Sequence, residues 1–284
     1  MTLIQIVVVA LVQGITEFLP ISSQAHLILL PRVMSWCDQG LVVDIGVHFG
    51  TLLAVMAYFW RNCLDLCRGI GSLARGRYNA KARLVFYVFI ASVPVFIGGY
   101  ALWQISGLEA MRSIAVIGWA TLCFGVLLWM ADKWGLRIYR IEHMTAAKAF
   151  MMGCAQVMAL IPGTSRAGIT MTAARMLGFE RTDAARFSLL MAIPAILGAA
   201  TVGGVELART GTPMFTTQVA LATLISFVTA LGAIAAMMRW LDRANFTPFV
   251  VYRIALGIAL LTAVYGFGII DASTDTAAIS ACIR

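Results

Sequence analysis

The sequence predicts an all-α polytopic membrane protein with an inverted-topology repeat, in which each half contributes one re-entrant helix-loop-helix and three transmembrane helices. Three observations support this prediction. Hydrophobic residues make up 61% of the 284 residues and charged residues only 12%, with a mean hydropathy of +0.89, so polar groups are too few to coat a soluble globule. Six apolar stretches are long enough to cross a bilayer. A polar motif with a central proline occurs once in each half.

The first half begins with a broken hydrophobic segment. Residues 1–33 are apolar but interrupted at Pro20 by a polar loop. Each piece is too short to span about 30 Å of hydrocarbon, so we predict a re-entrant hairpin. Apolar spans follow at 41–60, 84–103 and 111–131, and they complete repeat one at about residues 1–131.

The second half repeats this order. A Pro-centred segment at 149–177 has basic residues beside both of its ends, so both ends are expected on the same side of the membrane. Spans at about 187–206, 216–238 and 248–270 complete repeat two, at about residues 147–270. A small polar tail with Asp271 and Asp275 follows, and the whole chain, 1–284, forms a single integral membrane domain.

Basic residues predict the orientation. Residues 61–83 carry six Lys or Arg and one acid, and with residues 132–148 they are expected to be cytoplasmic loops. Of the 21 Lys and Arg, 15 fall in predicted cytoplasmic segments and 4 outside, while Arg166 and Arg253 fall within the membrane zone. This bias places both termini outside the cytoplasm. It also accounts for the net charge of +8, so no nucleic-acid partner is predicted.

The parity of the spans predicts how the two halves meet. Each half has three full spans, an odd number, so the second half enters the membrane from the opposite face. The two broken hairpins are then expected to meet near the midplane.

Two related motifs carry the predicted chemistry. Residues 13–26 read Q-G-I-T-E-F-L-P-I-S-S-Q-A-H, and residues 156–170 read Q-V-M-A-L-I-P-G-T-S-R-A-G-I-T. Proline followed by hydroxyl residues is typical of a helix start, because Pro lacks a donor that the first turn leaves free and Ser is a good N-cap. The free N–H groups and the positive end of the helix dipole favour an anion. Two such helix starts facing each other would hold a pyrophosphate.

Residues of the first motif have separate expected roles. Gln13 and Glu17 share a helix face, where their side-chain oxygens suit the binding of a divalent cation. Alternatively, Glu17 acts as a base. Ser22 is expected to cap the helix and bind phosphate. Ser23 is the candidate nucleophile, with His26, at i+3, or Glu17 accepting its proton. In the alternative mechanism, a metal-bound water attacks and the serines only bind phosphate.

The second motif is expected to bind the pyrophosphate. Gly163 allows a close approach of the backbone, and Arg166 offers a planar fork of donors that suits phosphate oxygens. Thr164, Ser165 and Thr170 supply hydroxyl groups for the same anion.

Other polar residues of the spans have competing interpretations. Arg253, near the inner end of its span, fits a snorkelling anchor better than a ligand. Asp44 and His48 are one turn apart, and a simple pair at the outer surface is as good an interpretation as a functional one.

These residues resemble the undecaprenyl-pyrophosphate phosphatase family, the bacitracin-resistance type of membrane phosphatase. The resemblance covers the chain up to about residue 270. It is carried by G-I-T-E-F-L-P-I-S-S-Q-A-H at 14–26 and P-G-T-S-R-A-G at 162–168, with support from H-F-G-T-L-L-A-V at 48–55 and P-F-V-V-Y-R at 248–253. The chain departs from the usual motifs at Ala25, where the family has Gly, and at Ala167, where it has Ser.

The resemblance implies an enzyme of the bacterial inner membrane with its active site facing the periplasm. It would hydrolyse undecaprenyl pyrophosphate to undecaprenyl phosphate and inorganic phosphate, recycling the carrier lipid for peptidoglycan synthesis, with magnesium or calcium as cofactor. The expected partners are the polyprenyl pyrophosphate and the lipid bilayer, and a homodimer is left open. Because inverted repeats with broken hairpins are also typical of transporters, an isoprenyl-phosphate transporter or flippase is the alternative function.

Overall fold

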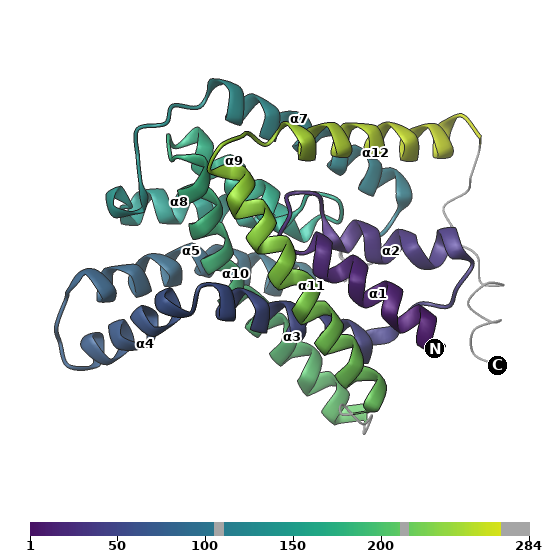
Figure 1. Ribbon diagram of the computed structural model, residues 1–284, viewed down its shortest axis with the longest axis horizontal. Helices are drawn as coiled ribbons and strands as arrows, with labels where there is room; N and C mark the ends of the chain where they lie inside the picture. The colour runs from purple at the N-terminus through teal and green to yellow at the C-terminus, as the bar shows by residue number, and fades with distance from the viewer. Residues whose placement is uncertain (105–110, 211–215, 268–284) are drawn as a thin grey trace.

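The computed structural model describes residues 1–104, 111–210 and 216–267, and all regular elements in these ranges are helices (Figure 1). Six of these helices are long and apolar enough to cross a membrane, so the protein is a multi-pass membrane protein. They are α3 (Gly40–Tyr58), α5 (Ala80–Gln104), α7 (Ile114–Trp134), α10 (Arg181–Thr210), α11 (Thr217–Leu241) and α12 (Thr247–Tyr265). Each coincides with one predicted span. The predicted tail with Asp271 and Asp275 lies outside the described residues.

Two broken helical hairpins occur where the sequence predicts them. Helices α1 (Leu3–Thr16) and α2 (Ser23–Met34) flank the first proline motif. Helix α8 (Ala146–Val157), the 3-10 helix η2 (Met158–Leu160) and α9 (Arg166–Met176) flank the second. Each of these helices is shorter than the roughly 20 residues that a span requires.

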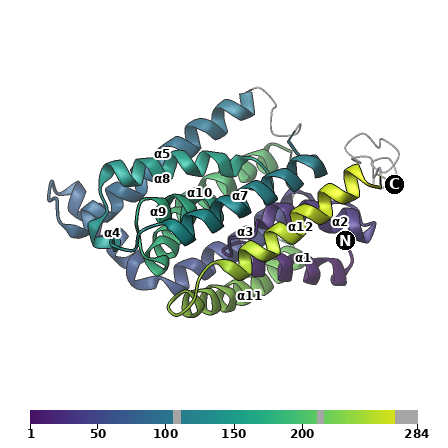
Figure 2. The same cartoon turned by 90° about the horizontal axis from the view of Figure 1, so that it is seen from above.

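Each hairpin packs against a span from the other half of the chain. Helix α1 packs on α11, and α8 packs on α5, while α3 lies against α11 and α7 against α12 (Figure 2). The α3–α11 contact is close because α3 has Gly50 at the crossing, where an added Cβ would collide with the backbone at Thr223. The largest apolar core joins residues from both halves, among them Phe18, Leu52 and Phe187.

The basic stretch 61–83 is largely helical and not the loop that we expected. Helix α4 (Trp60–Ala74) follows α3 almost directly, and only a short turn separates it from α5. Its half-buried Cys63 and Leu66 and buried Gly69 recur every three residues and form its inward face. Cys63 and Leu66 pack against the main apolar core, and Gly69 lies against Lys81 and Val85 of α5. Lys81 of α5 pairs with Asp65 at 2.8 Å. The hairpin lies at the opposite end of the molecule from the N-terminus (Figures 1 and 2).

A buried ion cluster joins four helices at the end of the molecule that carries the second basic segment. That segment contains the short 3-10 helix η1 (Ile141–His143). Asp132, at the end of α7, accepts hydrogen bonds from Arg175 of α9 (3.2 Å), from Arg181 of α10 (2.7 and 3.0 Å) and from the backbone N–H of Phe246 (3.2 Å). Since every oxygen of this buried carboxylate is paired, the cluster fixes the relative positions of these helix ends.

Candidate functional site

The two proline loops end in the same backbone arrangement. Ser22 and Ser165 have positive φ angles of 73° and 70°, which non-glycine residues rarely adopt. Their hydroxyl groups accept hydrogen bonds from the backbone N–H groups of Ala25 (3.4 Å) and Gly168 (3.0 Å). The predicted helix starts are thus confirmed, and Ser22 is the N-cap as expected. Helix α2 therefore begins at Ser23, and α9 begins at Arg166.

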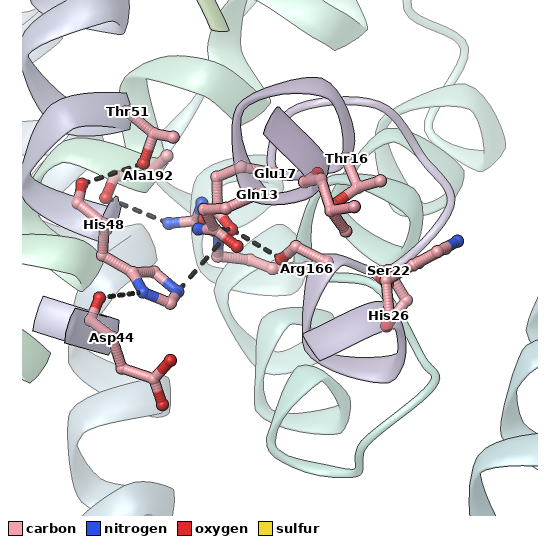
Figure 3. Close-up of polar contacts among 12 residues, drawn as sticks. Gln13, Thr16, Glu17, Ser22, His26, Asp44, His48, Thr51, Arg166 and Ala192 are labelled. Atoms are coloured by element: carbon pink, nitrogen blue, oxygen red, sulfur yellow. Dashed lines mark hydrogen bonds and ion pairs between the residues drawn. The ribbon is translucent and has the colours of Figure 1, made fainter. Parts of the chain in front are cut away.

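The carboxylate of Glu17 is the point at which the two motifs meet (Figure 3). Arg166 donates from Nη2 to Glu17 Oε1 at 2.6 Å. Ser23 donates from Oγ to Glu17 Oε2 at 2.6 Å. Gln13 donates from Nε2 to the same Oε2 at 2.9 Å. Glu17 is only 8% exposed, so these donors offset the cost of removing its charge from water.

His48 of α3 also faces this carboxylate. Its Nε2 lies 3.7 Å from Glu17 Oε2, while its Nδ1 lies 2.7 Å from the backbone carbonyl oxygen of Asp44 (Figure 3). A carbonyl can only accept, so Nδ1 carries the hydrogen and Nε2 is presented to Glu17. The hydrogen bond to Asp44 is made by its backbone carbonyl, and of the two interpretations that the sequence left open for this pair, the contact of His48 with Glu17 favours the functional one. The sequence feature that could have identified His48 as a site residue was its position as an ionisable side chain inside a predicted span.

His26 does not contact the Ser23 hydroxyl, contrary to the expectation from its i+3 spacing. Its Nδ1 lies 2.7 Å from the carbonyl oxygen of Ser22, and its Nε2 lies 2.5 Å from the hydroxyl of Tyr252 on α12, against which its ring stacks. These two contacts turn the imidazole away from Glu17. Of the two bases proposed for Ser23, only Glu17 is in contact with it.

Three of the expected phosphate-binding residues, Gly163, Thr164 and Thr170, do not line the cavity described below. The carbonyl of Gly163 accepts from Arg253 and Thr121, and Thr164 is fully buried. The Thr170 hydroxyl pairs with that of Ser188 at 2.5 Å and donates to the carbonyl of Arg166. Only Ser165 and Arg166 of the second-motif residues expected to bind the anion line the cavity described below.

Arg253 holds the two loops together from behind. It is fully buried and donates to the carbonyl oxygens of Pro20 in the first loop (3.2 Å) and Gly163 in the second (3.1 Å). It also donates to the carbonyls of Thr121 (3.2 Å) and Ala120 (3.5 Å) of α7. The interpretation as a snorkelling anchor is therefore wrong, because the guanidinium points into the protein, where it donates hydrogen bonds to backbone carbonyls.

A cavity of about 540 Å³ opens above the Glu17 carboxylate. Polar side chains from both motifs and from α3 line it, together with apolar side chains such as Leu27, Val95 and Ile196. The polar lining residues are Glu17, Ser22, Ser23, Gln24, Gln39, Asp44, His48, Arg112, Gln156, Ser165 and Arg166. The cavity therefore combines a hydroxyl held by a carboxylate, an arginine and two helix starts with apolar walls.

The oxygen atoms available for a cation are few. No group of three or more His, Cys, Asp or Glu that could hold a metal occurs in residues 1–104, 111–210 and 216–267. Glu17 provides a carboxylate, and the buried Oε1 of Gln13 has no protein partner there. Such hard oxygen ligands suit magnesium or calcium, which bind proteins through one or two carboxylates and complete their shell with substrate phosphate and water. The donor type thus fits, although the protein alone supplies an incomplete shell.

The chain is similar to a described protein family and to several named proteins over most of its length. The sequence matches the family described as bacitracin resistance protein BacA over residues 6–259. It is 46% identical over 271 residues to undecaprenyl-diphosphatase 1 of Rhodospirillum rubrum, covering 93% of this chain and 96% of that protein. It is 46% identical over 267 residues to the undecaprenyl-diphosphatase of Roseobacter denitrificans, covering 93% and 100%. It is 48% identical over 269 residues to that of Hahella chejuensis, covering 93% and 99%.

Proposed function

The chain belongs to the bacitracin resistance protein BacA family, and we infer that it is an undecaprenyl-diphosphatase that releases inorganic phosphate from undecaprenyl diphosphate. One observation carries the chemical argument: Glu17 binds the Ser23 hydroxyl and the Arg166 guanidinium in one cavity. Attack on a phosphoric anhydride requires a hydroxyl nucleophile, a base that accepts its proton and a positively charged group that binds the phosphate. Ser23, Glu17 and Arg166 fit these three roles in that order. The relatives' names favour this function over a transporter.

Purified protein in detergent micelles should release inorganic phosphate from undecaprenyl diphosphate. A transporter needs two compartments and yields no product in this assay, so the two functions separate in a single measurement. The matched control is the Arg166→Ala protein prepared in the same way, which should release little phosphate. Release at the same rate from both preparations would point to a contaminating phosphatase.

For the mechanism, we propose that Ser23 Oγ attacks the terminal phosphorus and that Glu17 Oε2 accepts the hydroxyl proton. The bond from this phosphorus to the bridging oxygen breaks, undecaprenyl phosphate leaves, and water then hydrolyses the phosphoserine to release phosphate. The 2.6 Å contact between the two oxygens supports this assignment of the base. The starts of α2 and α9 are capped by Ser22 and Ser165, which line the same cavity, so the remaining free N–H groups there would stabilise the charge that develops on the phosphate.

Arg166→Lys is expected to lower kcat/KM by roughly 10- to 150-fold although the charge is kept. A point-charge ammonium cannot form two parallel N–H bonds to phosphate, and a charge-assisted hydrogen bond contributes about 1.5–3 kcal/mol. Steady-state kinetics with undecaprenyl diphosphate measure this loss. Turnover close to that of the wild type would assign Arg166 a structural role through its contacts with Glu17 and Ala192.

We further propose that Glu17 and Gln13 hold a divalent cation, magnesium or calcium, together with the substrate diphosphate. The unpartnered Gln13 Oε1 beside the Glu17 carboxylate supports this assignment. The cation would neutralise charge on the diphosphate and make its terminal phosphorus more electrophilic.

Removal of divalent metal with EDTA should abolish phosphate release, and added magnesium or calcium should restore it. In Glu17→Gln, restoration should fail or require a much higher metal concentration, because a carboxamide carries no charge to attract the cation. A metal titration curve in Glu17→Gln that superimposes on that of the wild type would remove Glu17 from the cation site.

We propose that the two halves are inverted repeats and that the cavity faces the periplasm of the bacterial inner membrane. The exchange of partners, α1 on α11 and α8 on α5, is what a two-fold relation between the halves would produce. The basic α4 hairpin lies at the opposite end of the molecule from the N-terminus, which supports a cytoplasmic position for the hairpin. Arg112 and Gln39, which line the cavity, precede α7 and α3 at the proposed outer ends of these spans.

A cysteine placed at Asn79, in the turn between α4 and α5, is expected to resist membrane-impermeant maleimide in intact spheroplasts and to react after permeabilisation. Both preparations use a variant whose own exposed thiols, Cys67, Cys123 and Cys154 among the described residues, are replaced by serine. Labelling from outside without permeabilisation would reverse the proposed orientation.

A further inference from the structure

Gln156 is a buried polar side chain that the mechanism above leaves without a role. It lies in the last turn of α8, just before the second proline loop, and its relative exposure is 0%. Neither its Oε1 nor its Nε2 has a hydrogen-bond partner among the protein groups that the structure describes. It nevertheless lines the cavity, together with Ser165 and Arg166.

The corresponding residue of the first motif is already engaged. Gln13 lies in the last turn of α1 before the first proline loop, and its Nε2 donates to Glu17. The two hairpins thus place a glutamine at the same point. The first glutamine donates to the Glu17 carboxylate, and the second has no hydrogen-bond partner for its N–H groups among the described residues.

Packing does not explain a glutamine at this position. A buried carboxamide without partners is destabilising, and a methionine of similar length would fill the same space without this penalty. The penalty disappears when a ligand with acceptor oxygens binds. A carboxamide adds hydrogen-bond donors without adding a further charge beside the Arg166–Glu17 ion pair.

We propose that Gln156 is a substrate-binding residue whose Nε2 donates to the diphosphate oxygens of the polyprenyl diphosphate. This inference rests on the proposed phosphatase function. The end of α8 then belongs to the phosphate site, next to the start of α9. Proton transfer remains the role of Glu17 and Ser23.

The test compares Gln156→Met with Gln218→Met, which makes the same change at an exposed position of α11. We expect Gln156→Met to raise KM for undecaprenyl diphosphate by about 10-fold, the effect of losing one hydrogen bond to a charged acceptor. Its melting temperature without substrate should equal or exceed that of the wild type, while the upward shift on adding farnesyl diphosphate should shrink. Gln218→Met should match the wild type in all three measurements.

Gln156→Glu provides a second variant of nearly the same shape. Its carboxylate should repel the diphosphate, so KM should rise further than in the methionine variant. An unchanged KM in Gln156→Met, or a lower melting temperature with an unchanged farnesyl diphosphate shift, would overturn the proposal in favour of a structural role. Absence of phosphate release from the wild type would instead reject the function itself.

Discussion

Ser23→Ala is expected to lower turnover by about 10³-fold or more while the protein still binds the lipid. The Ser23 hydroxyl lies 2.6 Å from its proposed base, and alanine removes the oxygen that would attack phosphorus. Single-turnover assays on purified protein measure the loss, and the melting-temperature shift on adding substrate measures binding. The variant should keep the substrate-induced shift.

Ser22→Ala is the matched control because it removes a neighbouring hydroxyl with a different role. Ser22 Oγ accepts the N–H of Ala25 at the start of α2, so its loss should cost about 1 kcal/mol of stability and leave measurable activity. If Ser23→Ala keeps more than a few per cent of turnover, attack by a metal-bound water becomes the better account. The same follows if rapid-quench experiments on the wild type fail to trap a phosphoserine when its breakdown is slowed.

Arg253→Met is expected to destabilise the protein by about 3 kcal/mol or more and to abolish activity together with the fold of the site. The variant leaves the carbonyls of Pro20 and Gly163 buried without their donor, and both loops lose their common attachment. Thermal unfolding in detergent followed by circular dichroism measures the loss.

Arg253→Lys distinguishes the geometry of the donors from their charge. One ammonium cannot reach acceptors in two loops and on α7 at once, so we expect only partial recovery of the melting temperature. A methionine variant that melts within about 2 °C of the wild type would show that the loops hold their positions without Arg253.

The spans and helix starts could be predicted because their signals are local. Hydropathy over a window of about 20 residues located α3, α5, α7, α10, α11 and α12, and the Pro-x-Ser/Thr-Ser pattern located the two helix starts and the cap at Ser22. The cap at Ser165 was not predicted, because that residue was expected only to bind phosphate. Matched motifs in the two halves also predicted that Glu17 and Arg166 belong to one site. Their contact joins residues that are 149 positions apart in the chain.

Side-chain directions that depend on tertiary packing could not be predicted. His48 reaches Glu17 because α3 lies beside α1, and nothing near His48 in sequence reports that neighbour. His26 has the expected spacing from Ser23, yet Tyr252, 226 residues further along the chain, binds its ring. Arg253 binds backbone carbonyls, which leave no mark on the sequence because every residue has one.

The exchange of packing partners between the halves has a consequence for biosynthesis. Helix α1 is made first, but its packing partner α11 begins only at Thr217, and the Arg166 that pairs with Glu17 is made about 150 residues after it. An unpaired carboxylate is costly inside a bilayer. The first hairpin should therefore stay near the membrane surface until the second hairpin has been inserted. Assembly of the site is then a late event, completed only when most of the chain has left the ribosome.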